Sequence, residues 1–151
     1  MAQVVETIDV DVPVNIAYNQ WTQFETFPLF LSVVDEITQV DDRTNHWTVT
    51  VGGVTREFET VITEQLPDDR IAWTSERGDV DHAGVVTFHK LSDTSSRVAV
   101  QIDWEPAGFL EKTGAALHIP NAAVARELAS FKSFIEKQGI ADGAWRGTIE
   151  N

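Results

Sequence analysis

One helical pattern near the end of the chain limits what the rest of it can form. Within residues 110–138, large apolar side chains recur at spacings of four, three and four, which places them on one face of a helix with about 3.6 residues per turn. These residues are Val124, Leu128, Phe131 and Ile135. An apolar helix face needs a partner, and the partner that the preceding residues offer is a sheet. The sequence therefore predicts one long helix over Leu110–Gln138, kinked at His118–Pro120, that packs against a curved antiparallel sheet.

Strand patterns fill most of the chain before this helix. Apolar and polar residues alternate in several segments, and this alternation is typical of half-buried strands. The predicted strands span residues 4–12, 33–40, 46–51, 56–66, 70–77, 82–91 and 97–105. Residues 15–31 have the apolar spacing of two short helices instead. We therefore expect an α+β fold in which two short helices separate the first and second of seven strands.

The dipeptide Gly52-Gly53 fixes the register of one predicted hairpin, because glycine tolerates the positive φ angles of a two-residue turn. Residues that face each other across such a hairpin lie on the same side of the sheet. The predicted pairs are Val51 with Val54, Val49 with Arg56, and Trp47 with Phe58. We expect this mostly apolar side to face the long helix.

Composition excludes several classes of function. The chain has 151 residues, 24 acidic against 11 basic side chains, a net charge of -13 and no cysteine. A surface of this sign repels phosphate backbones and anionic lipid headgroups, so we expect no nucleic-acid partner. No apolar run approaches the roughly 20 residues of a membrane span, and no secretory signal pattern opens the sequence, so we expect no stable membrane insertion and a cytoplasmic location.

Common catalytic and metal-binding motifs are missing from the sequence. The four histidines have no helical two-histidine spacing, cysteine is absent, and neither a nucleophile elbow nor a phosphate-binding glycine loop occurs. We therefore expect no metal and no cofactor.

Several segments resemble a known superfamily. They are Tyr18–Pro28 (YNQWTQFETFP), Arg70–Trp73 (RIAW), Gly84–Phe88 (GVVTF), Phe131–Ile135 (FKSFI) and Ala144–Gly147 (AWRG). Together with the order of predicted elements, they resemble the START-like superfamily, also called the helix-grip or SRPBCC fold, and within it the bacterial polyketide cyclase/dehydrase branch. The resemblance implies a ligand-binding domain, which we place over residues 1–140. Gly139 is suited to end the long helix, and residues 141–151 are rich in small and polar side chains, so we expect a C-terminal tail there. The resemblance also implies a cavity between sheet and helix for an apolar molecule such as a lipid, a polyketide or a quinone.

Two polar residues on the predicted inner face are candidate catalytic groups. Arg56 could donate hydrogen bonds to a ligand carbonyl or carboxylate, or it could simply pack its stem on Trp47. His82 should face Val100, Ile102 or Trp104 across the sheet, and it could act as an acid or base with Asp81 or Asp103 orienting it. It could equally be a histidine at the rim without a chemical role.

The apolar residues on the predicted inner faces are candidates for contact with a ligand. They are Trp47, Val49, Phe58, Trp73, Gly84, Val86, Phe88, Ile102, Trp104, Val124, Leu128 and Phe131. We expect some of them to fill the core instead, as most buried aromatic residues do.

Three functions follow from these features. The leading hypothesis is binding of a small hydrophobic molecule. The first alternative is a polyketide cyclase/dehydrase, or aromatase/cyclase, that acts on a poly-β-ketone through Arg56 and His82. The second is a non-catalytic interaction module whose own side chains fill the cavity. The sequence leaves the ligand and the oligomeric state open.

Overall fold

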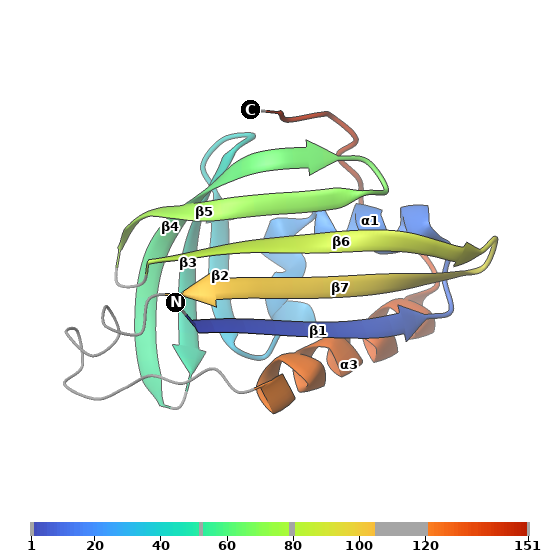
Figure 1. Ribbon diagram of the computed structural model, residues 1–151, viewed down its shortest axis with the longest axis horizontal. Helices are drawn as coiled ribbons and strands as arrows, with labels where there is room; N and C mark the ends of the chain where they lie inside the picture. Colours follow the sequence, from blue (N-terminus) through green and yellow to red (C-terminus); the bar gives the residue numbers. More distant parts are fainter. Residues whose placement is uncertain (1, 52, 79–80, 105–120, 151) are drawn as a thin grey trace.

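A computed structural model describes residues 2–51, 53–78, 81–104 and 121–150. Seven strands form one antiparallel sheet in the order β1-β7-β6-β5-β4-β3-β2 (Figure 1). The strands are β1 (Ala2–Val10), β2 (Val34–Gln39), β3 (Thr44–Val51), β4 (Val54–Leu66), β5 (Arg70–Gly78), β6 (His82–Ser92) and β7 (Ser95–Trp104). The helices are α1 (Val14–Trp21), the 3₁₀ helix η1 (Phe24–Leu29) and α3 (Asn121–Gln138). The predicted helix-grip fold is confirmed, including the two short helices between β1 and β2.

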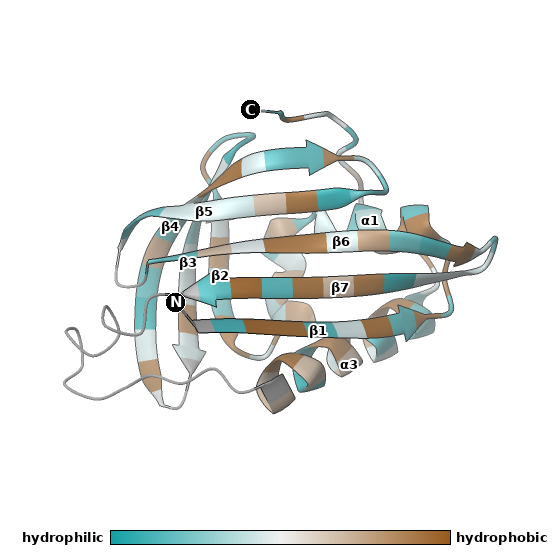
Figure 2. Cartoon of the chain, viewed as in Figure 1, coloured by the Kyte–Doolittle hydropathy of each residue, from teal (hydrophilic) through white to brown (hydrophobic). Residues whose placement is uncertain are grey.

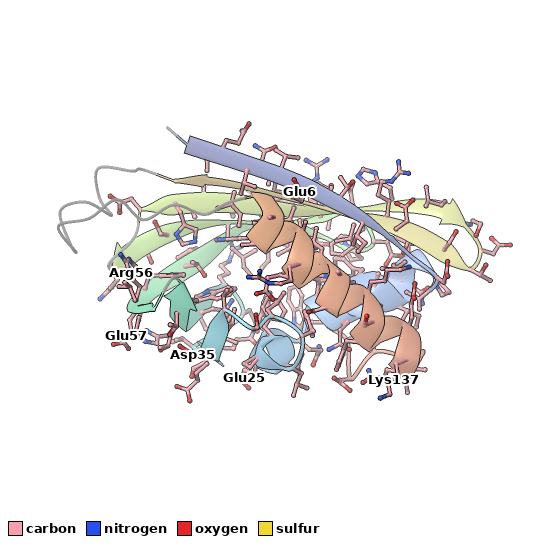
Figure 3. All side chains as sticks on the ribbon, turned by 90° about the horizontal axis from the view of Figure 1, so that it is seen from below. Glu6, Glu25, Asp35, Arg56, Glu57 and Lys137 are labelled. Atoms are coloured by element: carbon pink, nitrogen blue, oxygen red, sulfur yellow. The ribbon has the colours of Figure 1, made fainter. Side chains whose placement is uncertain are left out.

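The sheet is strongly curved, and the helices lie on one side of it (Figure 3). Irregular register within β4, at Glu59/Thr60 and at Ile62/Glu64, helps to bend the long strand, because a bulge adds local twist. A further irregularity at Val34/Glu36 bends the edge strand β2. The concave side therefore faces α1, η1 and α3.

The hairpin between β3 and β4 has the predicted register. Val51 pairs with Val54, Val49 with Arg56, and Trp47 with Phe58. Gly53 has a φ of 82°, which a residue with a side chain rarely adopts. His82 pairs with Trp104, one of its three predicted neighbours. The two-residue turn thus determines which residues of β3 and β4 face inward.

The apolar stripe of α3 is buried as predicted. Val124, Leu128, Phe131 and Ile135 all lie in the core, and Figure 2 shows hydrophobic residues recurring along α3 and along β1, β6 and β7. The helix ends before Gly139, whose φ is 75° and whose N–H donates to the Ile135 carbonyl at 2.8 Å. The predicted first part of this helix, residues 110–120 with the kink, lies outside the described residues.

The C-terminal segment runs back over α1 and β4. Ile149 exchanges two backbone hydrogen bonds with Gln65, at 2.7 and 2.9 Å, and its side chain is buried. Arg146 forms an ion pair with Asp68 at 2.8 Å and donates to Asn19 Oδ1 at 2.6 Å. The division into a domain at 1–140 and a tail at 141–151 stays a prediction.

Among the residues that the structure describes, no helix combines the length and the apolar character needed to cross a membrane. The cytoplasmic location and the exclusion of nucleic-acid partners stay predictions.

Candidate functional site

A cavity of about 220 Å³ lies between the concave face of the sheet and the helices. Its wall is almost wholly apolar, and aromatic rings from α1, η1, β3, β4 and β5 form much of it. These rings belong to Trp21, Phe24, Phe27, Trp47, Phe58 and Trp73. A dry apolar cavity of roughly 150 Å³ already binds benzene, so this one has room for a small ring system.

Most of the predicted ligand-contacting residues come together in this wall. Those that line the cavity are Trp47, Val49, Phe58, Trp73, Val86, Ile102, Val124 and Leu128. Trp104 lies opposite His82 in the backbone pairing, and its side chain is outside the described part of the structure. Whether the lining residues contact a ligand stays a prediction.

The structure places three of the predicted residues outside the cavity wall. Phe88 is buried beneath α1, where its ring meets that of Tyr18 edge-on at 5.2 Å. Phe131 packs against Trp21 and Phe30, with ring centroids 5.3 and 5.2 Å apart. Both residues therefore belong to the core on the inner face of the sheet and helix.

Gly84 is the third residue outside the wall. A Cβ atom added there would lie only 2.3 Å from Cζ2 of Trp73. The Trp73 indole thus covers Gly84, and it is Trp73 that lines the cavity. The absence of a side chain at residue 84 is what lets this ring lie flat against β6.

Arg56 is a cationic residue in the cavity wall. It comes from β4 beside the β3–β4 hairpin, and only 3% of it is exposed to solvent. Figure 3 shows it at the end of the sheet away from Lys137. Guanidinium groups keep their charge when buried, so Arg56 brings a permanent donor group to this end of the cavity.

His82 also lines the cavity, and neighbours from β4 and β5 hold it. Its ring meets that of Phe58 edge-on at 4.7 Å. Trp73 Nε1 donates to His82 Nε2 at 3.3 Å, and the His82 backbone N–H donates to Ser75 Oγ at 2.9 Å. Because Nε2 accepts this bond, the neutral imidazole carries its proton on Nδ1.

The carboxylates that we expected to orient His82 lie elsewhere. Asp103 faces the opposite side of the sheet from Ile102, where it accepts hydrogen bonds from Gln3 and Gln101 at 2.8 and 3.4 Å. The side chain of Asp81 is exposed. In their place, the indole of Trp73 orients the imidazole ring.

Sequence reasoning missed several polar residues of the wall. Asn45 and Thr60 are buried and face each other across β3 and β4, and Trp47 Nε1 donates to Thr60 Oγ1 at 2.8 Å. Glu127 of α3 accepts from the backbone N–H and the hydroxyl of Ser32, at 2.8 and 2.6 Å. The alternation that identified Trp47 and Phe58 also points to Asn45 and Thr60, which lie two residues away on the same faces.

A family model described as polyketide cyclase / dehydrase and lipid transport matches residues 10–132. The chain belongs to this family. The chain is also similar to a 17.2 kDa protein of Streptomyces lincolnensis, encoded in the melC2–rnhH intergenic region. It is 48% identical over 149 residues, and the alignment covers 99% of each chain.

Solved structures share the fold of this family member at low sequence identity. A Deinococcus radiodurans protein has a TM-score of 0.73 at 22% identity, covering 91% of this chain and 99% of its own. A START superfamily protein from Mycobacterium smegmatis has a TM-score of 0.67 at 16% identity, covering 90% and 95%. The Zhui aromatase/cyclase from Streptomyces sp. R1128 has a TM-score of 0.67 at 12% identity, covering 91% and 93%. These likenesses establish the helix-grip fold.

Proposed function

We propose that this protein binds one small hydrophobic molecule in the cavity between the sheet and α3. The observation that supports this most is the cavity itself, about 220 Å³ of space behind an almost wholly apolar wall. An apolar ligand gains by leaving water for such a space, and filling it restores contacts that the lining atoms lack. The family description, which includes lipid transport, agrees with this proposal.

The cavity offers a matched pair of variants for testing this proposal. Ala123 lines the cavity, whereas its neighbour Ala122 is exposed on the outer side of α3. Ala123→Phe should fill part of the space and weaken binding of N-phenylnaphthylamine, an apolar fluorescent probe, about tenfold or more. Ala122→Phe should leave binding unchanged, although it carries the same change in helix propensity. Equal binding by both variants, each shown to be folded, would place the site elsewhere.

Native mass spectrometry of freshly purified protein complements this test. A co-purifying apolar mass that is lost in Ala123→Phe would identify the chemical class of the ligand. The comparison also tests the alternative of a non-catalytic interaction module. If the protein's own side chains fill the cavity, no apolar molecule should co-purify with it.

A second candidate function is cyclisation and dehydration of a poly-β-ketone. It is favoured by the presence of Arg56 and His82 in the wall of one apolar cavity. In such a reaction, an enolate carbon attacks a carbonyl carbon within the same chain, and the resulting alcohol is lost as water. Arg56 would stabilise the developing negative charge on the carbonyl oxygen, and His82 would move the proton.

If the protein is a cyclase, variants at its two catalytic residues should lose turnover while they keep ligand binding. Arg56→Met and His82→Phe should retain binding of an apolar product within a few fold while they abolish turnover, because both groups would act on charge that forms in the transition state. Product analysis with a poly-β-ketone mimic provides the measurement. If wild-type protein binds the mimic yet gives the same product distribution as buffer, catalysis is refuted and ligand binding stands.

A further inference from the structure

We infer that the ligand enters the cavity with a hydrocarbon end first, and that this inner end carries no oxygen or nitrogen substituent. The inference rests on the proposed binding function and narrows the chemical class of the ligand. It separates molecules with a hydrocarbon end, such as an alkyl-substituted ring, from molecules that carry oxygen atoms along their whole length, such as a poly-β-ketone.

Three apolar side chains form a row across the floor of the cavity. Ile71 of β5 pairs with Val86 of β6, which in turn pairs with Val100 of β7. All three line the cavity, and we call them the inner row. His82 precedes Val86 by four residues on β6, which corresponds to roughly 13 Å along the strand. The floor of the cavity therefore extends from His82 to the inner row.

Helix α1 closes the cavity beyond the inner row. The next inward residues on β6 and β7 are Phe88 and Val98, which pair with each other and are buried. The Phe88 ring meets that of Tyr18 in α1 edge-on at 5.2 Å. Core packing thus takes the place of free space at this point, and the inner row is the closed end of the cavity.

The other end of the cavity reaches the molecular surface. Strands β4 and β6 are both antiparallel to β5, so they begin at the same end of the sheet (Figure 1). Val54 is the first residue of β4 and His82 the first of β6, and both line the cavity. Val54 is 36% exposed. A ligand can therefore keep its polar groups at this outer end while its other end meets the inner row.

Polar side chains in the described wall offer almost no polar surface to a ligand. Thr60 Oγ1 accepts a hydrogen bond from an indole N–H at 2.8 Å. Both carboxylate oxygens of Glu127 accept from Ser32, at 2.8 and 2.6 Å. Asn45 Oδ1 and Trp21 Nε1 are themselves buried beneath neighbouring atoms. The surface that a ligand meets at the inner row is therefore hydrocarbon.

This surface discriminates between ligand classes. A hydroxyl or carbonyl group placed against the inner row would lose its hydrogen bonds to water without a replacement, which disfavours binding. A poly-β-ketone has a carbonyl on every second carbon, so its end brings an oxygen to the inner row or next to it. An alkyl group avoids this cost and gains by leaving water. The inference therefore favours ligand binding over the cyclase candidate.

The experiment uses three compounds of nearly the same shape: p-xylene, p-cresol and hydroquinone. Displacement of N-phenylnaphthylamine measures their affinities. The hydroxyl of p-cresol can point to the outer end, so it should weaken binding by about 30-fold at most relative to p-xylene, the upper value for transfer into octanol. The second hydroxyl, in hydroquinone, must meet the inner row and should weaken binding by a further factor of about 100 or more.

A matched pair of variants on β7 tests where the hydrocarbon end lies. Val100→Thr adds a hydroxyl to the inner row, so it should reduce the cost of the second hydroxyl about tenfold. Val98→Thr makes the same change at the next inward position, beneath α1, and should leave this cost unchanged. Circular dichroism checks that both variants fold, and Val86→Thr offers the same group in the same row if Val100→Thr does not.

Each result distinguishes the inference from the proposed function. A second hydroxyl that costs no more than the first would overturn the inference and leave ligand binding in place. Equal effects of Val100→Thr and Val98→Thr would show that the ligand end lies elsewhere, which also overturns it. If N-phenylnaphthylamine binds but p-xylene does not displace it, the inference fails alone. If N-phenylnaphthylamine does not bind, the proposed binding function fails as well.

Discussion

Replacing Gly84 with alanine should test the cavity wall directly, because one methyl group must displace the Trp73 indole. The added Cβ would lie 2.3 Å from Trp73 Cζ2 and 2.8 Å from two further ring atoms. Ordinary van der Waals contact begins near 3.4 Å, so the ring must move by about 1 Å. The Trp73 ring has the backbone of β6 on one side and the cavity on the other, so it must move into the cavity.

The energetic cost follows from what this movement breaks. The bond from Trp73 Nε1 to His82 Nε2 is already 3.3 Å long, and a shift of this size would break it. Loss of that bond costs about 1 kcal/mol, and a strained Trp73 rotamer adds about 0.5–1.5 kcal/mol. The lower entropy of the unfolded chain with alanine offsets about 0.4–1 kcal/mol of this. We therefore expect Gly84→Ala to lower the free energy of unfolding by about 0.5–2 kcal/mol, towards the low end of the usual range for overpacking.

Urea denaturation and a titration with N-phenylnaphthylamine measure the two consequences. Probe affinity should fall severalfold, because the displaced indole enters the cavity. Ala83→Val, at the next residue on the outer face of β6, is the control and should change neither quantity much. In a Trp73→Phe background, Gly84→Ala should cost less by about 0.5 kcal/mol or more, because the smaller ring leaves room for the methyl group. A Gly84→Ala protein with unchanged stability and affinity would refute the placement of Trp73 over residue 84.

Three further predictions test the core and the surface. Leu128 is 2% exposed, so Leu128→Ala should cost about 2–5 kcal/mol in urea denaturation, and a change below about 0.5 kcal/mol would indicate an exposed site. Burial raises the pKa of Tyr18 above its ordinary value of 10.0. The buried neutral phenol therefore contributes its full stability below pH 10, and this contribution is lost as the pH rises through the raised pKa. Tyr18 is the single tyrosine of the chain, so near-ultraviolet absorbance should show no phenolate until the protein unfolds, and ionisation of folded protein near pH 10 would contradict its burial. Hydrogen bonds from Lys132 Nζ and the Asp11 backbone N–H lower the pKa of Glu136 below 4.5. The stability that the ionised Glu136 contributes is therefore present above this pH and is lost as the pH falls through the lowered pKa. Acid titrations of unfolding should show a weaker dependence on pH for Glu136→Gln than for wild-type protein.

Local patterns in the amino-acid sequence were enough to predict the architecture and much of the inner face of the sheet. Gly52-Gly53 allows a tight turn, and this turn places Val49 opposite Arg56 and Trp47 opposite Phe58. The spacing of Val124, Leu128, Phe131 and Ile135 defines one helix face. These features could be predicted because turn geometry and side-chain alternation are local properties, which depend on residues close together in the chain.

Which inward residues border the cavity depends on how the helices pack over the sheet, and local sequence patterns do not reveal this. Phe88 and Val86 share a strand face, yet α1 brings Tyr18 over Phe88, while Val86 lines the cavity. Trp73 covers Gly84, and Trp21 covers Phe131, although these partners are far apart in sequence or come from different elements. Alternation tells which face of the sheet a side chain occupies, but the helix packed above each position determines whether it meets another side chain or open space.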